Sequence, residues 1–142
     1  MSVIYPRVAL IGLGLIASSM ALAMRQYGLA TEIRGHAHSA ETRRIALELG
    51  LCDAVFETAA EAVAGADLVV LAVPVGVMGP IATEIGPHLK PGATLTDVGS
   101  VKQAVIDAVA CHVPDGVHFV AGHPVAGTEH SGPRSGFATL FK

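Results

Sequence analysis

Residues 7–18 read Arg7-Val-Ala-Leu-Ile-Gly12-Leu-Gly14-Leu-Ile-Ala17-Ser18, an apolar run that leads through two glycines into a second apolar run. The first run has the length and composition of a buried strand, and the second continues with the spacing of a helix. Glycine adopts backbone angles that other residues avoid, so two glycines between such elements permit a sharp turn. The stretch therefore predicts a strand, a tight turn and a helix, the first part of a βαβ fold.

Apolar runs alternate with segments of helical period along the rest of the chain, as in successive βαβ units. Strands are predicted at Arg7–Ile11, Glu32–Gly35, Ala54–Phe56, Asp67–Pro74, Ala93–Asp97 and Val117–Ala121. Helices are predicted at Ile16–Tyr27, Ala40–Leu49, Thr58–Val63, Val77–Leu89 and Val101–Val109. Pro80 and Pro87 are expected near the ends of the fourth helix or at a kink in it. The fold class is α/β, a doubly wound and mostly parallel sheet of the Rossmann type.

Length and composition limit the domain count and the partners. At 142 residues with 51% apolar side chains, the chain is long enough for one compact domain but not for two. This domain is expected to be incomplete at its C-terminal end, because residues 132–142 have no clear helix or strand pattern. The net charge of −3 and the absence of a Lys/Arg run argue against nucleic acid as a partner.

The cysteines and histidines predict neither a disulfide framework nor a metal site. Cys52 and Cys111 form no C-x-x-C pair, and the histidine spacings match no standard zinc pattern. The uncharged stretch Val8–Met24 raises the alternative of a signal peptide or short membrane span. Because Gly12 and Gly14 would interrupt an apolar helix, we expect instead a cytoplasmic protein with no membrane partner.

The glycine turn predicts a dinucleotide-binding site. The pattern Gly12-x-Gly14-x-x-Ala17 follows a predicted strand and opens a predicted helix, the context that makes the motif specific. Gly12 would permit the turn, Gly14 the approach of a pyrophosphate, and Ala17 the close packing of the helix. Unpaired amides at the helix N-terminus would bind the phosphates. The expected cofactor contacts are Gly12, Leu13, Gly14, Leu15 and Ile16, and a plain connecting turn is the structural alternative.

The end of the second predicted strand bears on the choice between NAD and NADP. NAD-binding domains usually carry an acid there for the ribose hydroxyls, and Ala37 takes that position in this sequence. Nearby polar and basic residues could instead surround a 2′-phosphate: His38, Ser39, Thr42 and Arg43. This favours NADP or use of both cofactors, although a solvated loop would also explain these residues. Val73 and Pro74, where the fourth strand ends, are further expected cofactor contacts.

Two candidate catalytic residues follow later strands, at the carboxyl edge where open α/β sheets place reacting groups. Ser100 is a natural helix N-cap, but capping leaves its hydroxyl proton free for a substrate. His123 lies in the polar, glycine-rich stretch 122–133 and is a candidate general base, because imidazole titrates near neutral pH. A purely structural role is the alternative for each.

The stretches Asp97-Val-Gly-Ser-Val-Lys102 and Gly122-His-Pro-Val-Ala-Gly-Thr-Glu129 together resemble the paired signature of prephenate/arogenate (cyclohexadienyl) dehydrogenases. The resemblance implies oxidative decarboxylation of prephenate to 4-hydroxyphenylpyruvate, or of arogenate to tyrosine, with hydride passing to the nicotinamide. It implies that His123 accepts the proton of the ring hydroxyl, that Ser100 holds this hydroxyl, and that the substrate pocket is lined by Thr128 and Glu129. Because members of this family continue into a helical domain that forms the dimer, it also implies a homodimer through a domain absent from these residues.

Two other functions remain open at this point. A related β-hydroxyacid or imine-type dehydrogenase would share the Gly12 turn and the Val73-Pro74 strand end, but it would not predict the stretch from His123 to Glu129. A non-catalytic module that senses a dinucleotide needs only the glycine turn, and it leaves Ser100 and His123 unexplained.

Overall fold

The structure is a computed structural model that describes residues 5–13, 15–98 and 102–120. Within these residues the strands form one parallel sheet in the order β3-β2-β1-β4-β5-β6. The strands are β1 Tyr5–Ile11, β2 Ala30–His36, β3 Ala54–Phe56, β4 Leu68–Leu71, β5 Thr94–Asp97 and β6 His118–Val120. The helices are α1 Leu15–Tyr27, α2 Ala40–Glu48, α3 Ala59–Val63, α4 Val75–Ile85 and α5 Lys102–Val109, with 3-10 turns η1 Gly86–His88 and η2 Ala110–His112.

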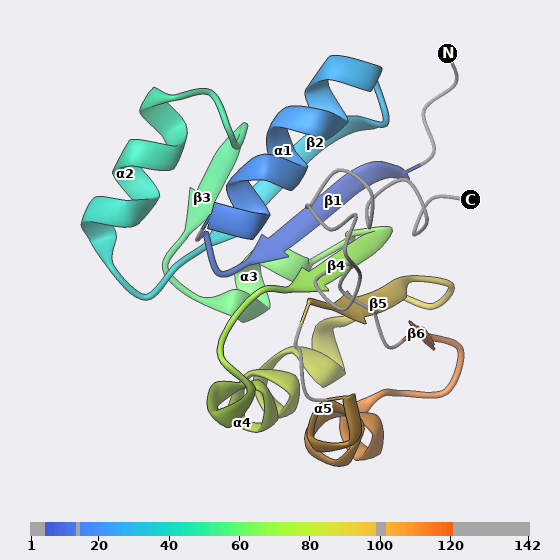
Figure 1. Cartoon of the computed structure of the whole chain (residues 1–142). Helices are drawn as coiled ribbons and strands as arrows, with labels where there is room; N and C mark the ends of the chain where they lie inside the picture. The colour runs from blue at the N-terminus through green and yellow to red at the C-terminus, as the bar shows by residue number, and fades with distance from the viewer. Residues whose placement is uncertain (1–4, 14, 99–101, 121–142) are drawn as a thin grey trace, which may run out of the picture.

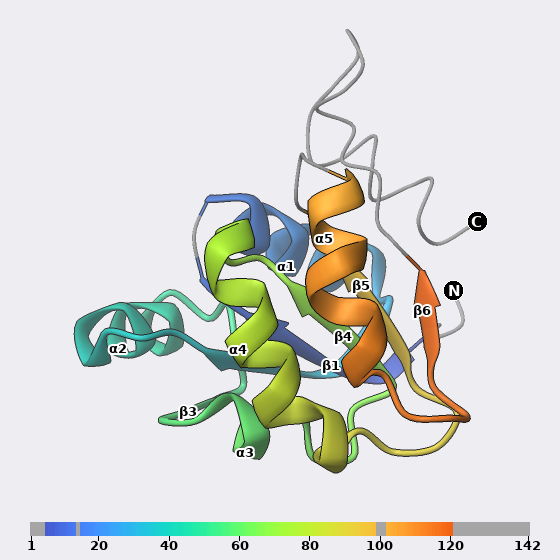
Figure 2. The ribbon, with the colours of Figure 1, turned by 90° about the horizontal axis from the view of Figure 1, so that it is seen from below.

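Helices cover both faces of the sheet, which confirms the predicted doubly wound α/β fold. In Figure 1, α1 and α2 lie on one side of the sheet, and α4 and α5 lie on the other. Figure 2 shows α4 and α5 side by side across the second face. One buried cluster joins the sheet to α1 and α2, and a second joins it to α3, α4 and α5. The strand order reverses between β1 and β4, the position at which open α/β sheets bind ligands.

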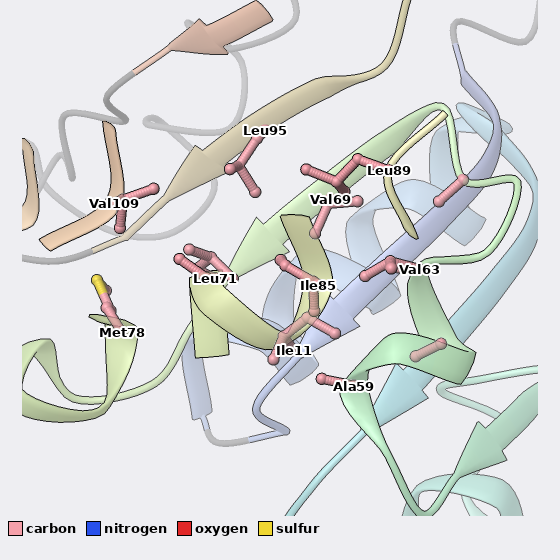
Figure 3. Packing of buried hydrophobic residues seen from close by; sticks show 14 of the residues in the cluster. Ile11, Ala59, Val63, Val69, Leu71, Met78, Ile85, Leu89, Leu95 and Val109 are labelled. Atoms are coloured by element: carbon pink, nitrogen blue, oxygen red, sulfur yellow. The ribbon is translucent and has the colours of Figure 1, made fainter. Parts of the chain in front are cut away.

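The central strand β4 is covered by helices on both faces, which explains the uninterrupted apolar run in its sequence. Successive side chains of a strand point to opposite faces, so a strand covered on both faces must be apolar throughout. Val69 and Leu71 belong to the cluster that includes Ile85 of α4, as Figure 3 shows, whereas Val70 belongs to the α1 cluster. All four residues of β4 are buried, and each contributes about 1.5–3 kcal/mol through removal from water.

The predicted boundaries differ most from the structure around β4 and α4, where the helix predicted at Val77–Leu89 spans Val75–Ile85. The run Asp67–Pro74 forms a strand only as far as Leu71, although Ala72 still donates a hydrogen bond to the Ile11 carbonyl at 2.7 Å. Of the two prolines expected near the ends of this helix or at a kink in it, Pro80 lies inside α4, and Pro87 lies just beyond its end in the 3-10 turn. Proline at position 80 cannot donate to the carbonyl of residue 76, and Gly76 is exposed, so water can reach that end of the helix.

The uncharged stretch Val8–Met24 forms most of β1, the glycine turn and most of α1. Of the helices in the described part of the chain, none is long and apolar enough to cross a membrane. The apolar side chains of this stretch instead supply the sheet core and the inner face of α1.

Asp67 ties three strands together at the amino edge of the sheet. Its backbone N–H donates to the Arg7 carbonyl at 2.7 Å, and its carbonyl accepts from the Thr94 N–H at 2.9 Å. Its carboxylate accepts from the Arg7 N–H at 2.9 Å and pairs with the Lys90 ammonium. Burial alone would raise the pKa of Asp67, but the hydrogen bonds from Lys90 and Arg7 outweigh it and hold the pKa below the ordinary value of 3.8.

Replacement of Asp67 by Asn removes the charge that faces Lys90 and should lower the free energy of unfolding by about 1–3 kcal/mol at pH 7. Because the folded-state pKa is depressed, the stabilisation is complete above the ordinary value of 3.8 and is lost as the pH falls through the lower, folded value. Urea unfolding of both proteins from pH 7 to pH 2 measures this. A stability difference as large at pH 2 as at pH 7 would contradict the assignment.

Candidate functional site

The Gly12 turn lies where the ends of β1, β2 and β4 meet. Its φ of +97° is a conformation that side-chain-bearing residues rarely adopt. The Gly12 N–H donates to the His36 carbonyl at 2.7 Å. A Cβ at this position would lie 2.5 Å from the Ala72 carbonyl oxygen, so only glycine fits between the two neighbouring strands. This geometry explains the requirement for glycine that the sequence predicted.

The helix that follows the turn packs as the motif requires. Helix α1 begins at Leu15, and Ala17 in its first turn is fully buried against the sheet cluster. The small side chain brings the helix N-terminus close to the carboxyl edge of the sheet, and amides at such an end attract phosphate. Gly14 lies outside the described residues, and of Leu15 and Ile16 only the backbone is described.

The turn after β2 brings the predicted cofactor-selecting residues together. Ala37 is 6% exposed, and its carbonyl accepts a hydrogen bond from Arg43 Nη1 at 2.7 Å. The same nitrogen lies 3.3 Å from the His38 carbonyl oxygen. Ser39 caps α2, because its Oγ accepts from the Thr42 N–H at 3.4 Å. The guanidinium group therefore lies beside the turn at which an NAD-type acid would be expected.

His36 stabilises the carboxyl edge of the sheet through two contacts that the sequence analysis did not predict. Its Nδ1 lies 3.0 Å from the Phe56 carbonyl oxygen, which joins the ends of β2 and β3. Its own carbonyl accepts from Gly12. One residue thus connects the glycine turn to the outer strand. No local sequence signal predicts the contact, because it depends on the register between two separate strands.

The ends of the later strands complete the described part of the edge. Val73 lies beside the turn, with its Cγ1 2.9 Å from the position of a Cβ on Gly12, and Pro74 precedes α4 as its N-cap. The Val98 N–H donates to the Leu71 carbonyl at 3.1 Å. Because β5 and β6 run parallel to β4, they end at the same edge as Gly12, at Asp97 and Val120. The candidates Ser100, His123, Thr128 and Glu129 lie outside the described residues.

Comparison with known proteins identifies the family. Residues 20–142 match the family model described as prephenate dehydrogenase, nucleotide-binding domain. The chain belongs to this family. The family predicted from the stretches 97–102 and 122–129 is therefore confirmed, and the glycine turn lies in a nucleotide-binding domain of the NAD(P) type. The match begins inside α1, so the turn itself is supported by its geometry and by the relatives described next.

The relatives that this chain matches extend well beyond it. Cyclohexadienyl dehydrogenase from Zymomonas mobilis is 41% identical over 139 residues, which cover 98% of this chain and 47% of that protein. A prephenate dehydrogenase from A. aeolicus, solved with hydroxyphenyl propionate and NAD+, is 31% identical with a TM-score of 0.78. The match covers 94% of this chain and 46% of the A. aeolicus chain. Synechocystis arogenate dehydrogenase is 29% identical with a TM-score of 0.74, and the match covers 84% of this chain and 41% of the Synechocystis chain. The chain thus spans less than half of each relative.

The Gly12 geometry predicts a specific cost for a side chain in the turn. Gly12→Ala should lower the free energy of unfolding by about 1–3 kcal/mol more than Gly50→Ala, because it adds a steric clash to the same unfavourable φ. Gly50 is the matched control, since its φ is +72° and nothing lies within 4 Å of its Cβ position. Chemical unfolding of both variants measures the difference. Equal losses of stability would show that the turn can relax away from Ala72.

Proposed function

We propose that this domain binds NAD(P) at the carboxyl edge of its sheet and serves an NAD(P)-dependent prephenate or arogenate dehydrogenase. The observation that carries the proposal is the Gly12 turn, at the reversal of strand order, in a chain that belongs to the prephenate dehydrogenase family. Such a turn followed by a helix N-terminus is the usual pyrophosphate site of Rossmann domains. The names of the relatives described above support the same activity.

The proposed reaction is an oxidative decarboxylation that needs one base and alignment. The nicotinamide of a dinucleotide held at the Gly12 turn would supply the hydride acceptor, and the ring carbon that bears the hydroxyl would be the hydride donor. We assign to His123 the removal of the hydroxyl proton and to Ser100 the holding of that hydroxyl. The bond between the ring and its carboxylate breaks, CO₂ leaves, the electron pair of that bond completes the aromatic ring, and the phenolate oxygen takes back the proton held by His123. Because aromatisation drives the loss of CO₂, positioned groups without a metal suffice.

The substrate and the assembly belong to the complete protein. We assign Thr128 and Glu129 to the substrate pocket, and we propose that prephenate or arogenate is the substrate. We also propose a homodimer formed through a helical domain outside these 142 residues. The length of the relatives supports that domain, since the chain covers 47% of the Zymomonas protein and 46% of the A. aeolicus protein.

We further propose that the site accepts NADP at least as well as NAD. A carboxylate at the end of β2 would repel a 2′-phosphate, and Ala37 offers only a buried methyl group in that place. Arg43 is held beside the same turn by its contacts with the Ala37 and His38 carbonyls. Guanidinium groups suit phosphate because their donors match its geometry. His38 and Ser39 are exposed next to it and can offer further hydrogen bonds.

The activity is tested with the full-length parent protein, two substrates and two cofactors. Absorbance of the reduced nicotinamide should rise with prephenate or arogenate, in the presence of NAD+ or NADP+. His123→Asn should lower kcat by roughly 10²–10⁴, because a general base contributes this much, while cofactor affinity is retained. Reduction with neither substrate would reject the proposed activity, and unchanged turnover by His123→Asn would remove His123 from the mechanism.

The cofactor preference is tested with the 142-residue chain and two neighbouring arginines. Arg43→Ala should weaken NADP+ binding by about 10- to 100-fold relative to NAD+ binding, the worth of a hydrogen bond to a charged group. Arg44→Ala removes an equal charge one residue away, where the side chain pairs with Glu48 at 2.5 Å, and it should leave the ratio unchanged. Calorimetric titration gives both dissociation constants. The same ratio in wild type and Arg43→Ala would reject Arg43 as the selecting residue.

A further inference from the structure

We propose that the absence of a side chain at Gly35 positions the nucleotide-binding turn, because it leaves beside Cys52 the space into which Leu13 packs, so that packing behind the turn sets the affinity for the dinucleotide. The inference rests on the proposed function, since it concerns the same site. It assigns a role to two residues, Gly35 and Cys52, that are not among the predicted cofactor contacts. It also assigns a role to the side chain of Leu13, whose backbone is a predicted contact. Gly35 belongs to β2, Cys52 precedes β3, and Leu13 is part of the turn itself.

The space above Gly35 is filled by the other two residues. A Cβ on Gly35 would lie 2.6 Å from Cys52 Sγ, closer than non-bonded atoms approach. It would also lie 3.2 Å and 3.3 Å from the two methyl groups of Leu13. The thiol and the isobutyl group therefore occupy the volume in which any other residue would carry its side chain. The absence of a Cβ at position 35 lets Leu13 pack down onto the sheet.

The backbone beside Cys52 is fixed to the sheet, which restricts movement of this residue away from Gly35. Asp53 N–H donates to the Ile33 carbonyl at 2.7 Å, and the Asp53 carboxylate accepts from the Ile33 N–H at 2.7 Å. Arg25 of α1 pairs with the same carboxylate at 3.2 Å. These contacts hold position 52 against both β2 and α1. A displacement near Gly35 is therefore transmitted more easily to the turn than to the chain before β3.

The thiol acts here as a neutral packing group. Cys52 is 3% exposed and belongs to the cluster that Leu13 covers from the outside. Burial raises the pKa of its thiol to about 11, with Arg25 lowering it and Asp53 raising it by charge. An uncharged sulfur packs against a leucine without a desolvation penalty. The hydrogen bond from Gly12 to His36 also holds the turn to β2, so the packing of Leu13 over Gly35 is a second contact between the turn and that strand.

A double-mutant cycle on the 142-residue chain tests the coupling, with NAD+ and NADP+ as ligands. Gly35→Ala should raise the dissociation constant about 10-fold or more, because the new methyl group displaces Leu13. Cys52→Ala removes the sulfur and should change it by less than about threefold. The double variant should bind within about threefold of wild type, since the space vacated by the sulfur accepts the new methyl group; contacting residues commonly show non-additivity of this size. Additive effects, or wild-type binding by Gly35→Ala, would overturn the proposal.

Val63→Ala controls for a general loss of stability. Val63 is fully buried in the cluster on the opposite face of the sheet. This variant should lower the Tm while leaving the dissociation constants unchanged at 15 to 20 degrees below that Tm, about the range in which most of the chain is folded. A rise in its dissociation constant equal to that of Gly35→Ala would overturn the proposal, because reduced stability alone would then explain the effect.

The rate of thiol alkylation supplies a second test that needs no folded variant. In wild-type chain, iodoacetamide should reach Cys52 only after the turn opens. NADP+ at 100 times its dissociation constant should slow this reaction by up to about 100-fold, by mass action on the closed state. Exposed Cys111 is the internal control and should react at an unchanged rate. Equal rates at Cys52 with and without bound NADP+ would overturn the inference alone, whereas failure of the wild-type chain to bind either dinucleotide would overturn the proposed function as well.

Discussion

The approach of three parallel strands at Gly12 is the constraint on which the rest of the site depends. The carbonyl of Ala72 leaves no room for a Cβ, and the N–H of Gly12 is already bonded to His36. The chain must therefore turn with a positive φ, and it enters α1 directly above the point at which the strand order reverses. Close packing and backbone hydrogen bonding together fix a helix N-terminus at one edge, and anion binding follows from that position.

The amino edge of the sheet stabilises the fold and the carboxyl edge is the proposed binding site, because charged side chains pair with one another at the first edge, whereas Arg43 at the second contacts backbone carbonyls. At the amino edge, Asp67 bonds to Arg7 and Lys90, and the Arg7 side chain also pairs with Glu32. These charges satisfy one another and stabilise the strands. At the carboxyl edge, Arg43 bonds to carbonyls of its own turn, and His38 and Ser39 are exposed. Cationic and polar groups thus remain near the position proposed for a ribose phosphate, where binding to a ligand would complete their hydrogen bonding.

Much of this could be predicted from the sequence, and what could not has a physical reason. The apolar run through β4 and the small residues of the Gly12 turn carry local periodic signals, so the fold and the nucleotide edge were predictable. The place of Pro80 was predicted only as an end or a kink of α4, because a helix tolerates the missing donor at an exposed position without any local sign. The contacts of His36 with Phe56 and of Cys52 above Gly35 depend on strand register across distant segments. Ser100 and His123 stay predictions from the family resemblance.

The central claim is that the carboxyl edge at Gly12 binds the dinucleotide, and amide chemical shifts test it most directly. A titration of the isotope-labelled 142-residue chain with NADP+ should shift the amides of Gly12, Leu13, His38 and Val73, which surround the turn. The amide chemical shifts of Arg7 and Asp67 at the opposite edge should stay unchanged. These two amides donate to the Asp67 carboxylate and to the Arg7 carbonyl, respectively, away from the proposed site. Shifts confined to the amino edge, or a folded chain with no shifts at saturating NADP+, would contradict the account.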